Sequence, residues 1–299
     1  MLGDTGGHCR GRIMPAVFAA LLDGSRVARE ILDEAALRVE RLRAASGVVP
    51  CLATVLVGED PASVTYTRMK RRRCESIGVR SVKLELPAET TTAQLIDRIR
   101  TLGEDHVVHG ILLQHPVPSH IDERAAFEAI PVEKDVDGVT FGSFARTWFG
   151  EGGYGSCTPA GILRLLDAYQ VRIEGLEAVV VGRSAILGKP MAGMLLGRHA
   201  TVTICHSRTR SLGEVVRRAD LVVAAVGRSR FVQGDWVKQG AVVVDAGYNP
   251  GNVGDVDFEP AAERASLITP VPGGVGPMTI ATLIDQTVTA AVRQVGVSL

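Results

Sequence analysis

The feature that most constrains this fold is a series of short, unbroken apolar runs alternating with amphipathic helical segments. In the second half of the chain the runs carry Val, Ala and Leu at consecutive positions, without the polar alternation of a half-exposed strand. Such runs are typical of parallel strands, because the crossovers between parallel strands place helices on both faces of the sheet. The chain is therefore predicted to be an α/β protein with parallel sheets.

The alternation falls into two blocks. In the first block, strands are expected at 52–57, 82–86 and 108–113, and helices at 16–42, 61–78, 92–102 and 121–130. In the second block, strands are expected at 178–181, 201–204, 221–226 and 241–245, and helices at 160–169, 190–198 and 212–218. Thr158 is expected to cap the helix at 160–169, and the Gly-rich stretch from Gly138 to Tyr154 to be a linker. A last helix after the loop Pro272–Pro277 is expected to pack back on the first block.

A chain of 299 residues suggests about two domains. We expect an N-terminal three-layer α/β domain at 14–156 together with 278–299, and a Rossmann-like domain at 157–277. Residues 1–13 are expected to be a disordered extension, with Met14 as an alternative start.

Composition excludes several kinds of partner. Lys plus Arg and Asp plus Glu both number 33, and this zero net charge argues against nucleic acid binding. No apolar run approaches the length of a membrane span. The five cysteines are scattered, which argues against disulfides and zinc and favours a reducing, cytoplasmic setting. Four histidines within residues 106–120 lack the spacing of a metal site, so no metal is predicted.

The segment after the strand at 178–181 has the order of a dinucleotide-binding turn. Gly182 allows a sharp turn, Gly188 allows a phosphate to approach the backbone, and Pro190 favours a helix start. Arg183 and Ser184 lie inside this turn. The full glycine fingerprint is absent, so an ordinary strand-to-helix turn is the alternative.

The next strand ends at Cys205, where an NAD enzyme would carry an acid for the ribose 2′-hydroxyl. Here Ser207 and Arg208 follow instead, and hydroxyl and guanidinium donors suit a 2′-phosphate. NADP is therefore favoured over NAD, with Arg183 and Ser207 as the best-placed contacts. A solvated basic loop is the alternative.

Candidate catalytic groups occur in the first block. Tyr66 and Lys70 share one face of a helix, and burial beside a phenol can lower a lysine pKa. Gln114 ends a strand at the edge where open α/β sheets bind ligands, and Asp135 and Asp137 follow in an irregular segment. Taken singly, each of these is more typical of a turn or cap.

Together these motifs resemble the bifunctional methylenetetrahydrofolate dehydrogenase/methenyltetrahydrofolate cyclohydrolases over nearly the whole chain. The resemblance rests on segments 57–63, 134–138, 157–159, 181–184 and 269–279, and on the Tyr66-x-x-x-Lys70 pair. It implies NADP-dependent oxidation of 5,10-methylenetetrahydrofolate to the methenyl form and hydrolysis to 10-formyltetrahydrofolate, in one-carbon metabolism. It also implies a homodimer and makes 14–156 with 278–299 the folate-binding domain and 157–277 the NADP-binding domain.

The resemblance also implies residue roles. Lys70 would be the central acid/base group, Tyr66 would contact the folate, and Gln114 would orient Lys70. Asp137, with Asp135 beside it, would hold the pterin. The loop with Pro272, Gly273 and Gly274 would line the cleft between folate and nicotinamide.

The chain departs from the family at His115 and Val117, where leucines are usual, and at Ser143 and Ala145, where the family commonly has other residues. An imidazole beside Gln114 could perturb Lys70. Two alternatives therefore stay open: a divergent paralogue that keeps one activity, and another NADP-dependent oxidoreductase of the amino-acid-dehydrogenase type, such as one acting on shikimate-type hydroxy acids.

Overall fold

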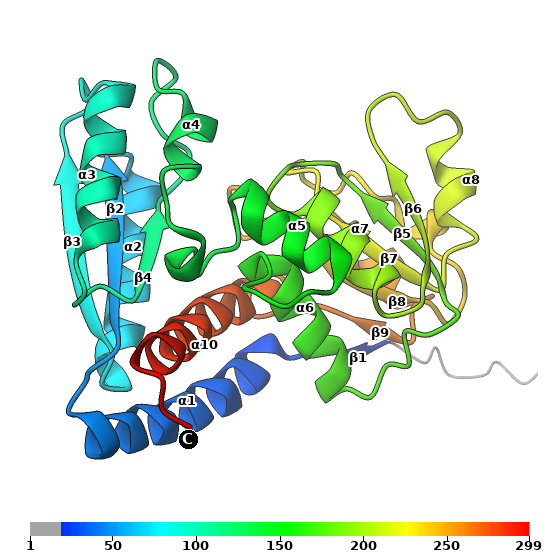
Figure 1. The fold of residues 1–299 in the computed structure, drawn as a ribbon. Helices are drawn as coiled ribbons and strands as arrows, with labels where there is room; N and C mark the ends of the chain where they lie inside the picture. Colours follow the sequence, from blue (N-terminus) through cyan, green and yellow to red (C-terminus); the bar gives the residue numbers. More distant parts are fainter. Residues whose placement is uncertain (1–18, 299) are drawn as a thin grey trace, which may run out of the picture.

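The computed structural model describes residues 19–298, which form two parallel sheets joined by long helices (Figure 1). The expected disordered extension at 1–13 and the alternative start at Met14 lie outside the described residues.

The first sheet has three parallel strands in the order β3-β2-β4. They are β2 (Cys51–Val57), β3 (Arg80–Leu86) and β4 (Gly110–Leu113). One face of β2 packs on α3 (Thr92–Glu104) and α4 (Glu123–Phe127), and Leu52 on its other face packs towards the long helices. The predicted three-layer α/β arrangement is confirmed.

Helix α2 (Pro61–Ser76) begins as its sequence predicts. Asp60 is the N-cap, and its carboxylate accepts the Ser63 N–H at 2.8 Å, while Pro61 takes the first helical position, where no N–H is needed. This local chemistry sets where α2 starts, and with it the position of Tyr66 and Lys70.

The second sheet has six parallel strands in the order β1-β9-β8-β7-β5-β6. They are β1 (Ala20–Leu21), β5 (Glu177–Val181), β6 (Thr201–Cys205), β7 (Leu221–Ala224), β8 (Val242–Asp245) and β9 (Leu267–Ile268). Helices α6 (Cys157–Ala168) and α7 (Gly188–Leu196) pack on one face. Helices α8 (Leu212–Val216) and α9 (Phe258–Ala262) pack on the other, together with the short 3-10 turn η2 (Gly234–Trp236). This is the predicted Rossmann-like sheet.

Several local expectations are wrong. The helix expected at 16–42 is α1 (Gly24–Ser46), because Ala20–Leu21 instead form β1 against β9. The cap of α6 is Ser156 rather than Thr158, whose hydroxyl lies 3.0 Å from that of Thr279. The last helix, α10 (Val275–Val295), begins inside the expected loop, so Gly276 and Pro277 belong to its first turn.

The expected linker at 138–154 contains a helix, α5 (Phe141–Phe149). Thr140 caps it by accepting the Ser143 N–H at 3.1 Å. Trp148 stacks on Phe144 and lies over Gly193 of α7, where an added Cβ would come within 2.2 Å of the indole. Helix α5 is therefore held by a neighbour distant in sequence.

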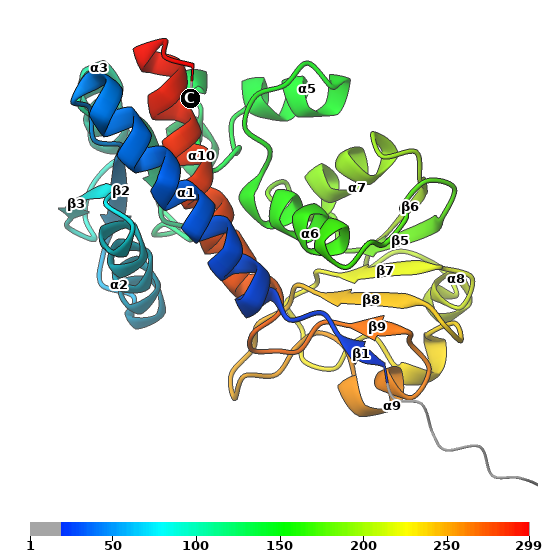
Figure 2. The same ribbon diagram turned by 90° about the horizontal axis from the view of Figure 1, so that it is seen from below.

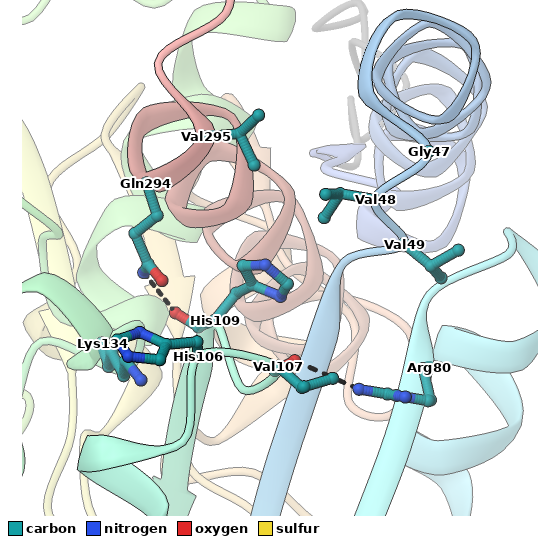
Figure 3. Close-up of a pocket in the computed structure, with 10 residues that line it drawn as sticks. All are labelled: Gly47, Val48, Val49, Arg80, His106, Val107, His109, Lys134, Gln294 and Val295. Atoms are coloured by element: carbon teal, nitrogen blue, oxygen red, sulfur yellow. Dashed lines mark hydrogen bonds between the residues drawn. The ribbon is translucent and has the colours of Figure 1, made fainter.

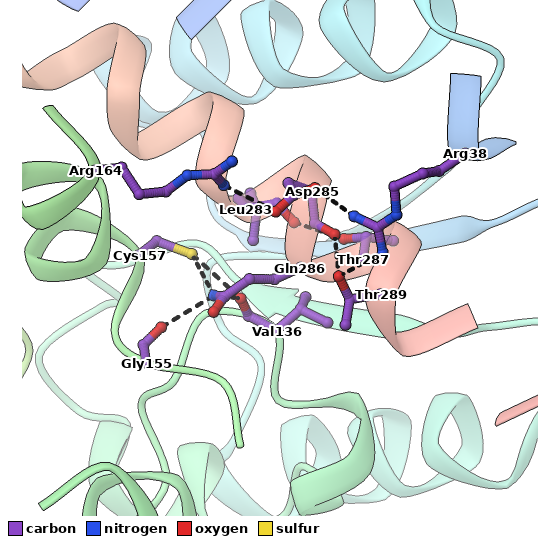
Figure 4. A network of polar contacts seen from close by, with 10 residues as sticks. All are labelled: Arg38, Val136, Gly155, Cys157, Arg164, Leu283, Asp285, Gln286, Thr287 and Thr289. Carbon is purple, nitrogen blue, oxygen red and sulfur yellow. Dashed lines mark hydrogen bonds and ion pairs between the residues drawn. The ribbon is translucent and has the colours of Figure 1, made fainter. Parts of the chain in front are cut away.

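Helices α1 and α10 lie side by side and connect the two sheets (Figure 2). Asp285 of α10 lies 2.7 Å from Arg38 of α1 and 2.8 Å from Arg164 of α6 (Figure 4). As predicted, the C-terminal helix packs back on the first sheet, through contacts with β2 and β4. Within residues 19–298, no helix is long and apolar enough to cross a membrane.

Candidate active site

Lys70 lies at the centre of a buried polar cluster beside the carboxyl end of β4. Its side chain is only 5% exposed. Its Nζ donates a hydrogen bond to Gln114 Oε1 at 3.0 Å and lies 4.3 Å from the ring centre of Tyr66. The structure thus brings together three residues that the sequence separates by up to 48 positions.

Gln114 is oriented by its own surroundings. Its backbone N–H continues the ladder by donating to the Val55 carbonyl at 2.8 Å. Its Nε2 donates to the His115 carbonyl at 2.7 Å, which turns the amide oxygen towards Lys70. The amide of Gln114 therefore serves as a fixed acceptor for the lysine.

Burial dominates the electrostatics of this cluster. It lowers the pKa of Lys70, while Asp137, Cys157 and Cys74 oppose that shift. It raises the pKa of the Asp137 carboxyl, against the opposing effect of Lys70 and His115. A neutral amine and a protonated carboxyl are therefore easier to reach here than in water, as general acid/base chemistry requires. His115, expected to perturb Lys70, acts on the pKa of Asp137.

Cys157 is a member of the cluster that the sequence argument did not single out as a site residue. It is buried, its Sγ lies 3.2 Å from the Val136 carbonyl, and burial and Asp137 raise its thiol pKa. Its place at the start of α6, directly after the cap Ser156, was the available signal.

Asp135 is not part of the cluster around Lys70. It is fully buried, and its carboxylate accepts the N–H groups of Val139 at 3.1 Å and Thr140 at 2.9 Å. It therefore holds the turn between Asp137 and α5. Ser143 is buried in α5, and within residues 19–298 its hydroxyl has no hydrogen-bond partner.

The loop with Pro272, Gly273 and Gly274 packs against the first turn of α1. The Ser25 N–H donates to the Gly273 carbonyl at 3.0 Å. A Cβ on Gly24 would lie 1.8 Å from the Gly274 oxygen, so the two segments meet backbone to backbone. The loop is thus positioned by α1, at the junction between the two sheets.

The predicted dinucleotide turn has the compact form that a phosphate cradle needs. Gly182, directly after β5, has φ +135°, and a Cβ on Gly188 would lie 2.3 Å from the Gly182 carbonyl oxygen. Ser184 Oγ accepts the N–H groups of Leu187 and Gly188, both at 3.2 Å. The Lys189 N–H donates to the Ser184 carbonyl at 3.0 Å, so the turn is closed on itself by its own hydrogen bonds at the start of α7.

Exposed Arg183, Ser207 and Arg208 follow neighbouring strands β5 and β6 at one sheet edge. Among residues 19–298, the side chains of Arg183 and Ser207 make no hydrogen bond or ion pair, so their donors are available to a ligand. Guanidinium and hydroxyl groups in this place fit a 2′-phosphate. No three His, Cys, Asp or Glu side chains gather as a metal site within the same range.

A buried acid of this sheet edge was missed by the sequence argument. Asp255 accepts the N–H groups of Val226, Gly227 and Arg228 at 2.6, 2.8 and 2.9 Å, and it shapes the loop after β7. Its partners are distant in sequence, so no local pattern could have indicated it.

The fold and the site define a two-domain α/β enzyme with a dinucleotide-binding sheet. A family model for the tetrahydrofolate dehydrogenase/cyclohydrolase catalytic domain matches residues 22–137, and one for the NAD(P)-binding domain of that family matches residues 156–295. The chain belongs to the tetrahydrofolate dehydrogenase/cyclohydrolase family. The predicted family and enzyme class are confirmed, and the shikimate-type alternative is not favoured.

Known relatives match this chain over nearly its full length and theirs. Bifunctional protein FolD 1 of Streptomyces avermitilis is 63% identical over 279 residues, 93% of this chain and 97% of the relative. The bifunctional FolD structure from Campylobacter jejuni has a TM-score of 0.90 at 43% identity, covering 92% of this chain and 99% of that one. The Trypanosoma brucei FolD, solved with NADP cofactor and an inhibitor, has a TM-score of 0.90 at 37% identity, covering 95% and 100%.

Proposed function

We propose that the protein oxidises 5,10-methylenetetrahydrofolate with NADP+ and then hydrolyses the methenyl product to 10-formyltetrahydrofolate. The observation that carries this proposal is the buried Lys70 amine, hydrogen-bonded to Gln114 at 3.0 Å beside Tyr66 and Asp137. The family match supports both activities, and the NADP complex of the Trypanosoma brucei relative supports the cofactor.

For the oxidation, this chain holds both reactants in place. Bound NADP+ supplies the hydride acceptor. Gly182, Ser184 and Gly188 shape the turn for its pyrophosphate, and Arg183, Ser207 and Arg208 bind its 2′-phosphate. Pro272, Gly273 and Gly274 line the cleft where the folate meets the nicotinamide. No protein side chain needs to carry redox chemistry.

For the hydrolysis, Lys70 handles the proton. Burial favours its neutral amine, which takes a proton from the water as the water oxygen bonds to the methenyl carbon. The adduct then breaks its carbon–N5 bond as the hydroxyl proton passes to N5, and Lys70 releases the first proton to solvent. Gln114 orients the amine, Tyr66 packs against the folate, and Asp137 hydrogen-bonds the pterin. Asp135 acts on substrate through the turn that it holds next to Asp137.

One incubation tests the substrate, cofactor and number of activities. The enzyme is mixed with methylenetetrahydrofolate and either NADP+ or NAD+, and reduced nicotinamide and methenyl absorbance are followed separately. Lys70→Met should abolish methenyl hydrolysis, since general acid/base assistance is worth about 10²- to 10⁴-fold. Lys189→Met, an exposed lysine of α7, is the control. If Lys70→Met hydrolyses the methenyl form as fast as wild type, the assignment is wrong; if only one product forms, the protein is the single-activity paralogue.

We further propose that residues 14–156 with 278–299 form the folate-binding catalytic domain and 157–277 the NADP-binding domain. The family implies a cytoplasmic homodimer, joined through the nucleotide domain, that serves one-carbon metabolism and purine biosynthesis. Light scattering on the purified protein tests the dimer, and a monomer mass across the working concentration range would exclude it.

A further inference from the structure

A second pocket opens at the opposite edge of the first sheet from Gln114. It has a volume of about 620 Å³ and lies at the amino ends of β2, β3 and β4, between the ends of α1 and α10 (Figure 3). Arg80 is the first residue of β3, and His109 directly precedes β4. Because Gln114 follows the carboxyl end of β4, the pocket is separate from the active site.

The charged groups that line this pocket are basic. Arg80 and Lys134 contribute the cations, and His106 and His109 add imidazoles, with no acidic side chain in the lining. Lys134, in the 3-10 turn η1 (Val132–Lys134), donates to the Asp105 carbonyl at 2.7 Å, and Arg80 donates to the Val107 carbonyl at 3.2 Å. Within residues 19–298, neither cation forms an ion pair with a carboxylate.

His109 offers a donor without a partner. It is only 4% exposed, and its Nδ1 accepts the Cys51 N–H at 3.2 Å. The neutral ring therefore carries its proton on Nε2. Within the described residues Nε2 makes no hydrogen bond, and Figure 3 shows the ring between the end of α10 and the segment 47–49.

The surrounding charges keep this imidazole neutral. Burial lowers the pKa of His109, Lys134 and Arg80 lower it further, and Asp105 opposes them. The Asp105 carboxylate is already used, because it accepts the Val107 N–H at 2.8 Å. Lys134 is itself only 8% exposed, and burial lowers its pKa too. Buried Lys134 and exposed Arg80 line one pocket that has no acidic side chain in its lining, and this local positive charge favours a bound anion.

We propose that this pocket is a binding site for a small phosphate monoester. Several donors spread around one space match the three acceptor oxygens and high charge of a phosphate better than the flat face of a carboxylate. Val48, Val49 and Val295 supply an apolar wall for the organic group of the ester. The site does not depend on the proposed catalytic roles.

The test uses the full chain with saturating NADP+, so that a phosphate cannot bind at Arg183 and Ser207. Phenyl phosphate is titrated while the ring signals of His109 are followed by NMR, and His109→Gln assigns those signals. We expect a saturable shift and a raised His109 pKa, because a bound dianion stabilises the imidazolium. Inorganic phosphate, which lacks the apolar group, should bind more weakly, and benzoate more weakly still.

Variants locate the site. Arg80→Ala and Lys134→Ala should each weaken the binding of phenyl phosphate about tenfold, since each removes a charged hydrogen bond to the ligand. Arg72→Ala, which removes an exposed arginine of α2 outside the pocket, should leave the affinity unchanged. Dehydrogenase turnover checks that every variant is folded. The proposal would be overturned if the His109 signal of the wild type does not respond to phenyl phosphate, or if Arg72→Ala weakens phenyl phosphate binding as much as the pocket variants do. Benzoate binding as tightly as phenyl phosphate would refute the choice of phosphate.

Discussion

Replacing Gln114 by Leu should shift the pH profile of methenyl hydrolysis. Gln114 Oε1 accepts a hydrogen bond from Lys70 Nζ at 3.0 Å, and Asp137, ahead of Cys157 and Cys74, also favours the charged form of the lysine. Leucine keeps similar bulk but cannot accept a hydrogen bond. The charged form of Lys70 then loses its fixed partner in a buried place.

The size of the expected shift in the Lys70 pKa follows from the lost hydrogen bond between Lys70 and Gln114. A hydrogen bond to a charged group contributes about 1.5–3 kcal/mol. One pKa unit corresponds to about 1.4 kcal/mol, so the pKa of Lys70, already lowered by burial, should fall by roughly another one to two units. If the neutral amine is the base, the rising limb of activity moves to lower pH by that amount. If the ammonium is the acid, the falling limb moves the same way.

The assay measures kcat/KM for methenyl hydrolysis across pH, for wild type, Gln114→Leu and Gln114→Glu. The glutamate variant is the matched control, because a carboxylate at the same distance should raise the Lys70 pKa and move the limb to higher pH. NADP+ affinity reports that both variants are folded. A limb that stays in place in both variants, or moves in the same direction in both, would refute the idea that Gln114 tunes Lys70.

Three further predictions concern the cofactor and the fold. Arg183→Ala and Ser207→Ala should raise the KM for NADP+ about tenfold or more and leave that for NAD+ nearly unchanged, since each removes a donor to the 2′-phosphate; equal loss for both cofactors contradicts the assignment. Gly188→Ala should weaken the binding of NADP+ and of NAD+ alike, measured by calorimetry, because the new Cβ would lie 2.3 Å from the Gly182 carbonyl oxygen. Methenyl hydrolysis should persist. Unchanged affinity for both cofactors would mean that the turn does not hold the pyrophosphate. Asp285→Ala should lower the free energy of unfolding in urea by about 1–3 kcal/mol, because Arg38 and Arg164 lose their shared partner. The exposed Asp167→Ala, which breaks the pair with Arg198, should cost less than about 1 kcal/mol, and an equal loss would show that the α10 ion pairs are ordinary surface pairs.

The sequence by itself determined the features that depend on residues close together in the chain. The unbroken apolar strands required covered parallel sheets, Asp60 and Pro61 set the start of α2, and Gly182 and Gly188 marked the dinucleotide turn. Each of these depends on neighbours a few residues apart. The resemblance of the motifs added the family and its chemistry, which no spacing argument reached alone.

The tertiary structure decided whatever depends on distant partners. The segment 138–154 has the composition of a linker, and α5 forms there because it packs on α7. Strands β1 and β9 are two residues long and exist only by pairing within the sheet. No sequence pattern indicates that the Asp135 carboxylate accepts two backbone N–H groups. Lys70 and Gln114 meet because α2 packs beside the edge where β4 ends, and burial there, which no sequence pattern measures, shifts the lysine pKa.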